Sequence, residues 1–325
     1  MTYCEDAFRG GCLVYADGAG GPLRILISGS TGLLGTSLSH RLESEGHEIV
    51  RLVRPETPGA SGIAQAKIVR WDTSSDQFDT TGAEGADALI HLAGASIADG
   101  RWNASRKNLL RTSRIDATRH LIAALSRLRR PPGVIVSASG IGYYGDRREE
   151  ELTETSLPGK DFLAQLCTEW EMEASRGSQF GARVVLLRFG IILSGSGGAL
   201  PRMALPFKFG AGGKLGSGRQ WMSWLTLEEA VNMIHFALTH PALAGPANAV
   251  APHPVRNAEF TRVLAKVLHR PALFPAPEFA LRLALGEMAD GLLLASQRVI
   301  PTKLAACGYQ FLQTELEQAL KKKLE

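Results

Sequence analysis

Cysteine is scarce in this 325-residue chain, and the chain contains no long apolar run. The four cysteines form no C-x-x-C pair, and no histidine stands at metal-ligand spacing from them. Both absences argue against a disulfide scaffold and a structural zinc site. No stretch approaches the roughly 18 apolar residues that span a membrane, and the first 23 residues lack the basic start and apolar middle of a signal peptide. We therefore expect a cytoplasmic protein with no membrane contact and no metal.

An excess of charge of one sign is also missing. Lys and Arg number 36 against 32 Asp and Glu, a net charge of +4. The Arg-rich stretch 101–130 forms no dense basic stripe and contains no known nucleic-acid-binding motif, so a solvated helix face accounts for most of it. We expect no nucleic-acid partner, and a pocket for an anionic cofactor explains a few of the arginines better.

Short apolar runs alternate with amphipathic segments. Strands are predicted at 24–28, 47–53, 68–71, 88–92, 134–137 and 183–188, and helices at 32–45, 105–129 and 161–175. This order is typical of an α/β fold with a doubly wound parallel Rossmann sheet. Later helices are predicted at 227–238, where Thr226 and Glu229 form a capping box, and at 258–268, 279–285 and 314–322.

Composition and the order of the predicted elements divide the chain into three parts. Residues 1–23 are rich in glycine and predict a flexible leader, and residues 24–193 predict an NADP-binding Rossmann core that is completed by about 225–250. The remaining segments, 194–224 and 251–325, predict a smaller and mostly helical C-terminal substrate region.

The strongest motif lies between the first strand and the first helix. Three glycines recur there at three-residue spacing, in the sequence Gly29-Ser30-Thr31-Gly32-Leu33-Leu34-Gly35. The first glycine permits a tight turn, the second lets the backbone approach a pyrophosphate, and the third lets the helix pack on the sheet. No Lys-Ser/Thr pair follows, which excludes a Walker loop. The motif predicts a dinucleotide site at the helix N-terminus.

The end of the second strand selects the cofactor. An NAD site usually carries Asp or Glu about 20 residues after the glycines, to bind the ribose 2′-hydroxyl. Here the strand ends in arginines instead, with Arg54 best placed and Arg51 the second candidate. Because arginine suits a 2′-phosphate, we predict NADP(H).

With these features in place, further segments carry a family resemblance that runs from about Arg24 to Leu320. The chain resembles the extended short-chain dehydrogenase/reductase superfamily, and within it the poorly characterised epimerase family branch with a small C-terminal domain of unknown function. The segments that carry the resemblance are Leu92-Ala93-Gly94, Arg101-Trp102-Asn103, Ser113-Arg114, Ser139 to Gly145, Asp161 to Ala164, Trp170-Glu171, Gly197 to Leu200, Gly212 to Trp224, and Gly286 through Gly308-Tyr309.

The resemblance implies further cofactor residues. Leu92, Ala93 and Gly94 follow the fourth strand and should pass the adenosine half of the cofactor. Arg114 stands where the superfamily usually has an asparagine and should reach the cofactor. Ile191 and Ile192 should run along the nicotinamide.

The catalytic pair of the superfamily, Tyr-x-x-x-Lys, is absent from the sequence. Anchored on Trp170-Glu171, its two places fall near Leu163 and Cys167, neither of which transfers protons as that pair does. The remaining catalytic candidates are Ser139, in the place of the superfamily's substrate-binding Ser or Thr, and Tyr143 and Tyr144.

A glycine-rich, basic segment follows in the C-terminal part and predicts the substrate contacts, which are Lys208, Lys214, Arg219, Gln220 and Trp221. These side chains suit a small anionic substrate, for which a nucleotide sugar is one candidate. Two functions stay open: an NADP-dependent oxidoreductase or epimerase, and a non-catalytic NADP(H)-sensing regulatory protein. For the assembly, a homodimer is the candidate.

Overall fold

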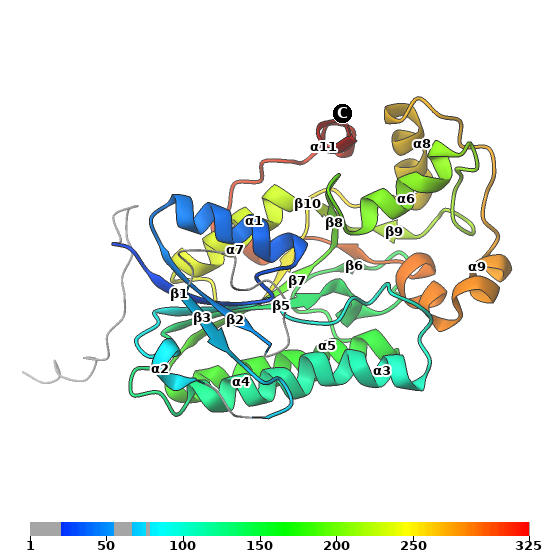
Figure 1. The fold of residues 1–325 in the computed structure, drawn as a ribbon. Helices are drawn as coiled ribbons and strands as arrows, with labels where there is room; N and C mark the ends of the chain where they lie inside the picture. Colours follow the sequence, from blue (N-terminus) through cyan, green and yellow to red (C-terminus); the bar gives the residue numbers. More distant parts are fainter. Residues whose placement is uncertain (1–20, 55–66, 76–78, 325) are drawn as a thin grey trace, which may run out of the picture.

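A seven-stranded sheet forms the centre of the computed structural model, which describes residues 21–54, 67–75 and 79–324 (Figure 1). The strand order is β11-β7-β5-β4-β1-β2-β3, and every neighbouring pair is parallel. Parallel strands buried on both faces explain the apolar runs in the sequence. The strands are β1 (Arg24–Ser28), β2 (Glu48–Val53), β3 (Lys67–Arg70), β4 (Ala88–His91), β5 (Val134–Gly140), β7 (Arg183–Phe189) and β11 (Gly245–Ala249).

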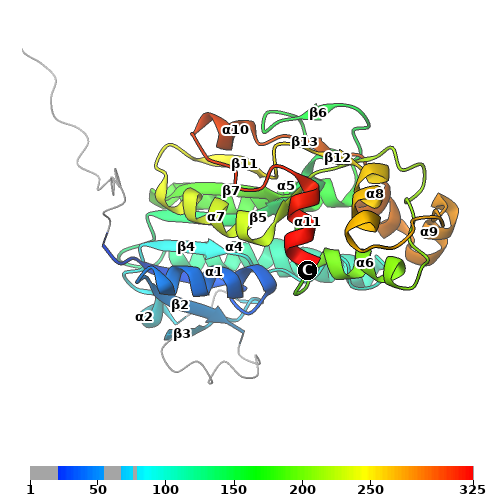
Figure 2. The same ribbon diagram turned by 90° about the horizontal axis from the view of Figure 1, so that it is seen from above.

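Helices cover both faces of this sheet. On one face α1 (Leu33–Ser44) and α7 (Leu227–Thr239) lie side by side, and on the other lie α4 (Ala117–Leu125) and α5 (Phe162–Ser175) (Figures 1 and 2). Each face has its own apolar core, one including Leu38 and Ile234 and the other Leu121 and Ala174. The doubly wound Rossmann fold predicted from the sequence is therefore confirmed.

The predicted helix 105–129 is a composite of three pieces. It consists of α3 (Ala104–Arg111), the π-helical segment η2 (Thr112–Asp116) and α4, and it ends at Leu125. The apolar periodicity of a long helix is hardly changed by a single π turn, so the sequence predicted one continuous helix and not the π-helical segment. A short helix that was not predicted, α2 (Thr80–Ala83), is capped by Asp79.

The elements of the C-terminal segments, with β6 from the chain after β5, are β6 (Glu151–Leu152), β8 (Ile191–Leu193), α6 (Ala199–Lys208), β9 (Trp221–Met222), β10 (Trp224–Thr226), β12 (Val255–Arg256), α8 (Asn257–Val267), α9 (Glu278–Leu285), η5 (Ala289–Leu294), β13 (Arg298–Val299), α10 (Thr302–Ala306) and α11 (Leu316–Leu324). Helices α6, α8 and α11 share a further apolar core at the carboxyl end of the strands, whereas α10 packs against β11 of the main sheet (Figure 2). The short strands pair as β8 with β10, β9 with β12 and β6 with β13.

Helix α6 of the C-terminal region was not among those predicted. It lies within the glycine-rich segment 194–220 and continues through Pro206. The predicted leader lies mostly outside the described residues, since residues 1–20 are not described, but Leu23 is buried in the core. Within the described ranges, every helix is too short or too polar to cross a bilayer.

Candidate functional site

The glycine loop is packed so closely that two of its positions accept only hydrogen. Gly29 has a φ of +71°, and a Cβ built there would lie 2.8 Å from the backbone nitrogen of Ala93. A Cβ on Gly35 would lie 2.1 Å from the carbonyl oxygen of Gly29. The first strand, the first helix and the end of β4 therefore meet backbone to backbone, which is the role predicted for the first and third glycines.

The N-terminus of α1 is open to an anion. Its N-cap is Gly32, which offers no side-chain hydrogen bond, and no acidic residue lies in the first turn. The buried Ser30 Oγ has no hydrogen-bond partner within the described residues. Unpaired N–H groups, the helix dipole and an unsatisfied hydroxyl fit the phosphates of a dinucleotide.

The other residues of the glycine loop differ in exposure and in what they contact. Thr31 is exposed, and Leu34 packs against the core beneath α1. Leu33 meets the segment that precedes α6, because a Cβ on Gly198 would lie 3.3 Å from Leu33 Cδ2. Ile191 and Ile192, on β8, are half-buried, and the Ile192 carbonyl oxygen lies 3.9 Å from the same Cβ position. The C-terminal part of the chain thus borders the glycine loop.

The two arginines of the second strand have different surroundings. Arg51 is 7% exposed and donates from Nη1 to Ser39 Oγ (3.1 Å) and from Nη2 to Glu43 Oε1 (2.9 Å), both on α1. Arg54 is exposed at the carboxyl end of β2. Only Arg54 stands clear of the packing between strand and helix.

The loop after β4 brings Leu92, Ala93 and Gly94 beside the glycine loop and beside Arg114. Gly29 packs on Leu92 and Ala93, and a Cβ on Gly94 would lie 3.0 Å from Arg114 Cζ. Arg114 Nη1 is buried and has no hydrogen-bond partner within the described chain. Predicted cofactor residues from separate segments are therefore neighbours at the carboxyl edge of the sheet.

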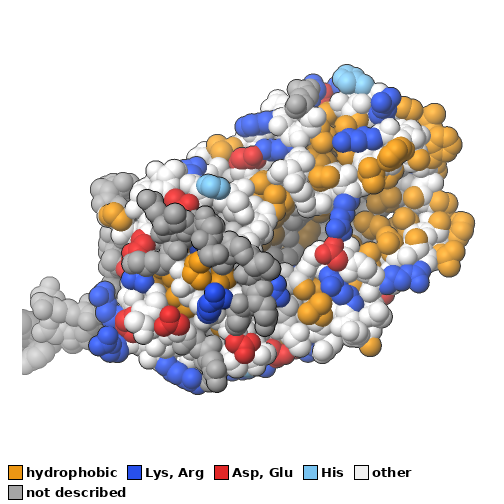
Figure 3. All heavy atoms as spheres, in the orientation of Figure 1, with side chains coloured by type: hydrophobic (Ala, Val, Ile, Leu, Met, Phe, Trp, Pro, Cys, Tyr) orange, Lys and Arg blue, Asp and Glu red, His pale blue; other side chains and the backbone are white. Residues whose placement is uncertain are grey.

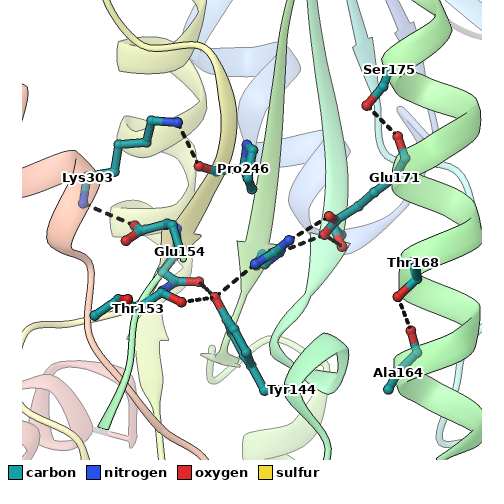
Figure 4. A network of polar contacts seen from close by, with 12 residues as sticks. Tyr144, Thr153, Glu154, Ala164, Thr168, Glu171, Ser175, Pro246 and Lys303 are labelled. Atoms are coloured by element: carbon teal, nitrogen blue, oxygen red, sulfur yellow. Dashed lines mark hydrogen bonds and ion pairs between the residues drawn. The ribbon is translucent and has the colours of Figure 1, made fainter. Parts of the chain in front are cut away.

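A buried network connects the three catalytic candidates with two charged residues, Glu171 and Arg188, and Figure 4 labels Tyr144 and Glu171 at its two ends. Ser139 Oγ donates to Glu171 Oε1 (2.7 Å), and Glu171 forms a two-pronged ion pair with Arg188 through bonds of 2.8 and 2.7 Å. Arg188 Nη1 donates to the Tyr144 hydroxyl (3.0 Å), and the Arg188 guanidinium lies 3.4 Å from the centre of the Tyr143 ring. The network spans β5, α5, β7 and the segment after β5.

Tyr144 is fully buried, and its hydroxyl also contacts Asn248 Oδ1 (2.6 Å) and the Thr153 carbonyl (3.0 Å). Burial raises the pKa of Tyr144 to about 12, against the effect of Arg188. Its hydroxyl therefore joins three chain segments and is not directed to solvent. Tyr143 is half-buried.

Sequence reasoning missed Glu171 and Arg188 as members of this network. A signal was present for Arg188, because it interrupts the apolar residues of β7 between Leu187 and Phe189, and a buried charge must find a partner. Glu171 served only to anchor the resemblance. Its contact with Arg188 joins residues of a helix and a strand, so helical periodicity did not reveal it.

The places of the missing Tyr–Lys pair are filled by apolar packing. Leu163 and Cys167 lie on α5 and are 5% and 7% exposed. Leu163 packs against Gly142 and belongs to a core cluster with Trp102 and Met288. Burial raises the pKa of the Cys167 thiol to about 12, so it is neither a cation nor a thiolate near neutral pH.

A pocket of about 370 Å³ lies beside this cluster, at the N-terminal end of α5. Its walls come from α5, α9, η5 and the segment after η3 (Ile141–Tyr144). Among the described residues of the lining, Trp102 and Phe162 provide aromatic surface and Arg282 is the one cation. Five carboxylates complete the lining, namely Asp146, Asp161, Glu278, Glu287 and Asp290.

None of the five predicted substrate residues lines this pocket. Lys208, Lys214 and Arg219 are exposed. Gln220 is 6% exposed, and its side-chain amide donates to the carbonyls of Leu215 and Leu293. These two hydrogen bonds join segments of the chain to each other and leave the amide no free N–H for a substrate. The guanidinium groups of Arg256 and Arg298 lie 4.6 and 5.1 Å from the centre of the Trp221 ring, and the Trp221 indole nitrogen donates to Glu149 (3.0 Å). The structure does not bring these five side chains together around one cavity.

One cluster in the described chain has the composition of a metal site, although the sequence predicts none. Glu45, His47 and His235 lie with ligand atoms within 4.8 Å of one another. The cluster is poorly prepared for a metal, since Arg41 already pairs with Glu45 and the Leu23 amide donates to His47 Nδ1 (3.1 Å). Metal-bound histidines instead donate from their second nitrogen.

The sequence model of the NAD dependent epimerase/dehydratase family matches residues 25–250, and a domain of unknown function (DUF1731) matches residues 276–322. Epimerase family protein Mb2239 of Mycobacterium bovis is 41% identical over 298 residues, 91% of this chain and 96% of that protein. Epimerase family protein YfhF of Bacillus subtilis is 38% identical over 301 residues, 92% of this chain and 97% of that protein.

A solved structure agrees with these sequence matches. Human epimerase family protein SDR39U1, crystallised with NADPH, superposes with a TM-score of 0.83 at 32% identity, covering 93% of this chain and 99% of that one. The resemblance inferred from the sequence is confirmed, including its small C-terminal domain. This chain belongs to the NAD dependent epimerase/dehydratase family.

Proposed function

We propose that this chain binds NADP(H) and acts as an NADP-dependent oxidoreductase or epimerase of the extended short-chain dehydrogenase/reductase type. The glycine loop carries the proposal, because it combines an uncapped α1 N-terminus with the buried, unpartnered Ser30 hydroxyl of the described chain. Such donors are satisfied by an anion at the helix N-terminus. The NADPH bound to the human relative supports the same choice of cofactor. When bound, NADP(H) supplies hydride transfer.

Arg54 is the residue that we assign to the 2′-phosphate. It is exposed at the end of β2, whereas the Nη1 and Nη2 atoms of Arg51 are held by Ser39 and Glu43. Arg51 thus has a structural role between β2 and α1, and of the two candidates that the sequence offers we propose Arg54, the first, for the 2′-phosphate.

The cofactor assignment is tested by titrating the protein with NADPH and NADH. We expect NADPH to bind more tightly, and Arg54→Ala to remove about 1.5–3 kcal/mol of that preference, as for a charge-assisted hydrogen bond. Arg262→Ala, which changes an exposed arginine of α8, is the control. Equal affinity for both nucleotides, or equal effects of the two substitutions, would contradict the assignment.

For the chemical step we assign Ser139 to substrate orientation and Tyr143 to proton transfer. The Ser139 hydroxyl already donates its hydrogen bond to Glu171, so the Ser139 oxygen is left to accept a hydrogen bond from a substrate hydroxyl. The Tyr143 ring is half-buried beneath Arg188. Tyr144 is left a structural role, because its hydroxyl is buried among three partners.

A small anionic, nucleotide-sugar-like substrate stays a prediction from the sequence, because Lys208, Lys214 and Arg219 are exposed and do not line one cavity. It gains no support from the 370 Å³ pocket, whose carboxylates would repel an anion. A panel of nucleotide sugars, hydroxy acids and amino-alcohols, each deuterated at the carbon that bears the hydroxyl, should be incubated with the protein and NADP+, which accepts the hydride as the alcohol becomes a carbonyl. Deuterium transferred to the nicotinamide, or a substrate recovered with inverted configuration, identifies a substrate class. Ser139→Ala and Tyr143→Phe should lower the rate about 100-fold, the size of a general acid–base contribution, without changing NADPH affinity.

The second candidate function is a non-catalytic NADP(H)-sensing regulator. The apolar side chains at the two catalytic places, Leu163 and Cys167, favour it. It predicts tight NADPH binding, neither deuterium transfer nor inversion with any substrate of the panel, and a protein partner whose affinity changes with the bound nucleotide. Label transfer that depends on Ser139 excludes this function.

A further inference from the structure

Arg114 is a half-buried cation whose charge is not balanced by the described protein. Its Nη1 atom is buried without a hydrogen-bond partner, and no carboxylate of the described residues forms an ion pair with it. Burial lowers its pKa, and the nearby positive charge of Arg106 acts in the same direction. An unpaired buried charge is costly, so it persists where a ligand completes it.

The backbone around Arg114 holds it in place. It lies in the middle of η2, the π turn between α3 and α4, and such turns are frequent at functional sites. The neighbouring Ser113 Oγ accepts a hydrogen bond from the Ala95 amide (3.2 Å), which joins η2 to the loop after β4. The guanidinium lies flat against Gly94, where a Cβ would be 3.0 to 3.3 Å from three of its atoms. A side chain at position 94 would displace Arg114.

The contacts of Arg114 place it between the glycine loop and α5. Gly94 directly follows Ala93, which touches Gly29 of the glycine loop. On the other side, Arg114 Cζ lies 5.1 Å from the Trp170 ring centre, and the charge of Arg114 acts on the pKa of the Cys167 thiol. Cys167 itself carries no charge. Arg114 is therefore the cation at the junction of the loop after β4 and α5.

We propose that Arg114 binds the nicotinamide-side half of NADP(H), through its ribose and phosphate oxygens, and supplies from η2 the positive charge that position 167 of α5 does not supply. The inference rests on the proposed NADP(H) site. It has a consequence for the free protein. Without nucleotide, Arg114 destabilises the fold, and bound nucleotide removes that penalty, so nucleotide binding and stability are coupled through this residue.

Two ligands and matched variants test the proposal. NADPH has both halves, whereas 2′,5′-ADP lacks the nicotinamide riboside phosphate. Arg114→Met keeps the apolar stem and removes the charge, and Arg114→Lys keeps the charge. Arg111→Met is the control, because Arg111 lies one turn away on α3 and pairs with Glu169 at the surface. Arg54→Ala tests the adenosine side.

For Arg114→Met we expect about 10- to 100-fold weaker NADPH binding, unchanged 2′,5′-ADP binding and a melting temperature of the free protein that rises by a few degrees. Arg114→Lys should recover part of the NADPH affinity, and Arg54→Ala should weaken both ligands. Arg111→Met should leave both affinities unchanged.

A lower melting temperature of free Arg114→Met, including failure to fold, would overturn the proposal, because it would show that the guanidinium stabilises the free protein. An equal loss of both ligands, or of neither, would overturn it too. If the wild-type chain binds 2′,5′-ADP and NADPH alike while Arg114→Met changes neither, only this inference fails. If the wild type binds neither ligand, the proposed function fails with it.

Discussion

His91, at the carboxyl end of β4, shows how burial fixes the state of a single side chain. It is 1% exposed, and its two ring nitrogens lie 2.6 Å from Ser28 Oγ and 2.8 Å from Thr118 Oγ1. Burial lowers its pKa from 6.5 to about 4, and the charge of Arg114 acts in the same direction. The folded protein therefore holds a neutral imidazole that the unfolded chain would protonate near pH 6.

This difference makes stability depend on pH. Between the folded pKa of about 4 and the unfolded value of 6.5, the unfolded chain binds more protons, so the free energy of unfolding falls as the pH is lowered through that window. The shift is equivalent to about 3 kcal/mol. We expect urea titrations of His91→Gln at pH 7 and pH 4 to show a pH-dependent loss about 3 kcal/mol smaller than in the wild type. His253→Gln, which changes a histidine with a 66% exposed side chain, should keep the wild-type slope.

The start of α7 shows what an element needs from distant segments. Of the two hydrogen bonds of the predicted capping box, one is formed. Thr226 Oγ1 accepts a hydrogen bond from the Glu229 amide (3.2 Å). The Glu229 carboxylate does not return to the cap. It accepts hydrogen bonds from the Leu312 amide (2.9 Å), the Gln313 amide (2.8 Å) and the Tyr309 hydroxyl, and so holds the chain before α11 on α7.

Glu229→Gln should therefore cost more than the loss of the cap. Its amide nitrogen cannot accept, so a buried N–H or O–H loses its partner at a cost of about 1–3 kcal/mol. Thr226→Ala should cost about 1 kcal/mol. Hydrogen exchange separates the two effects, since the Leu312 and Gln313 amides should exchange faster in Glu229→Gln and at the wild-type rate in Thr226→Ala. Similar exchange in both variants would mean that the carboxylate does not hold this segment.

At the scale of the whole molecule, some C-terminal segments are buried in the main core and others lie exposed at one end. Leu304 and Tyr309 are buried in the same core as β1, α1 and α7. By contrast, α9 has no buried residue, and apolar side chains gather over the end formed by α6, α8 and α9 (Figure 3). The large exposed apolar residues there are Leu205, Phe209, Leu273, Phe274, Phe279 and Leu283. The homodimer stays a prediction.

Matched leucine substitutions distinguish these two kinds of segment. Leu304 is fully buried and Leu283 is 76% exposed. We expect Leu304→Ala to lower the free energy of unfolding by about 2–5 kcal/mol, because it leaves a cavity in the main core. Leu283→Ala should change it by less than about 0.5 kcal/mol. Chemical denaturation followed by tryptophan fluorescence measures both. A large effect at Leu283 would indicate that α9 is covered in solution.

The sequence by itself determined the strands and most helices of the sheet, the glycine loop and the family. Short-range patterns encode these features, because apolar runs, the spacing of Gly29, Gly32 and Gly35 and helix caps act within a few residues. It also located the loss of the catalytic pair, since Tyr-x-x-x-Lys is a local spacing.

Only the tertiary structure decided which polar side chains meet. The contact of Arg188 with Glu171 and Tyr144 joins residues up to 44 positions apart, and that of Arg114 with Gly94 joins two loops of the sheet edge. The same packing engaged Arg51 with α1 and left Arg54 exposed. These outcomes depend on burial, which makes an unpaired charge costly and so selects its partner from whatever the fold brings near.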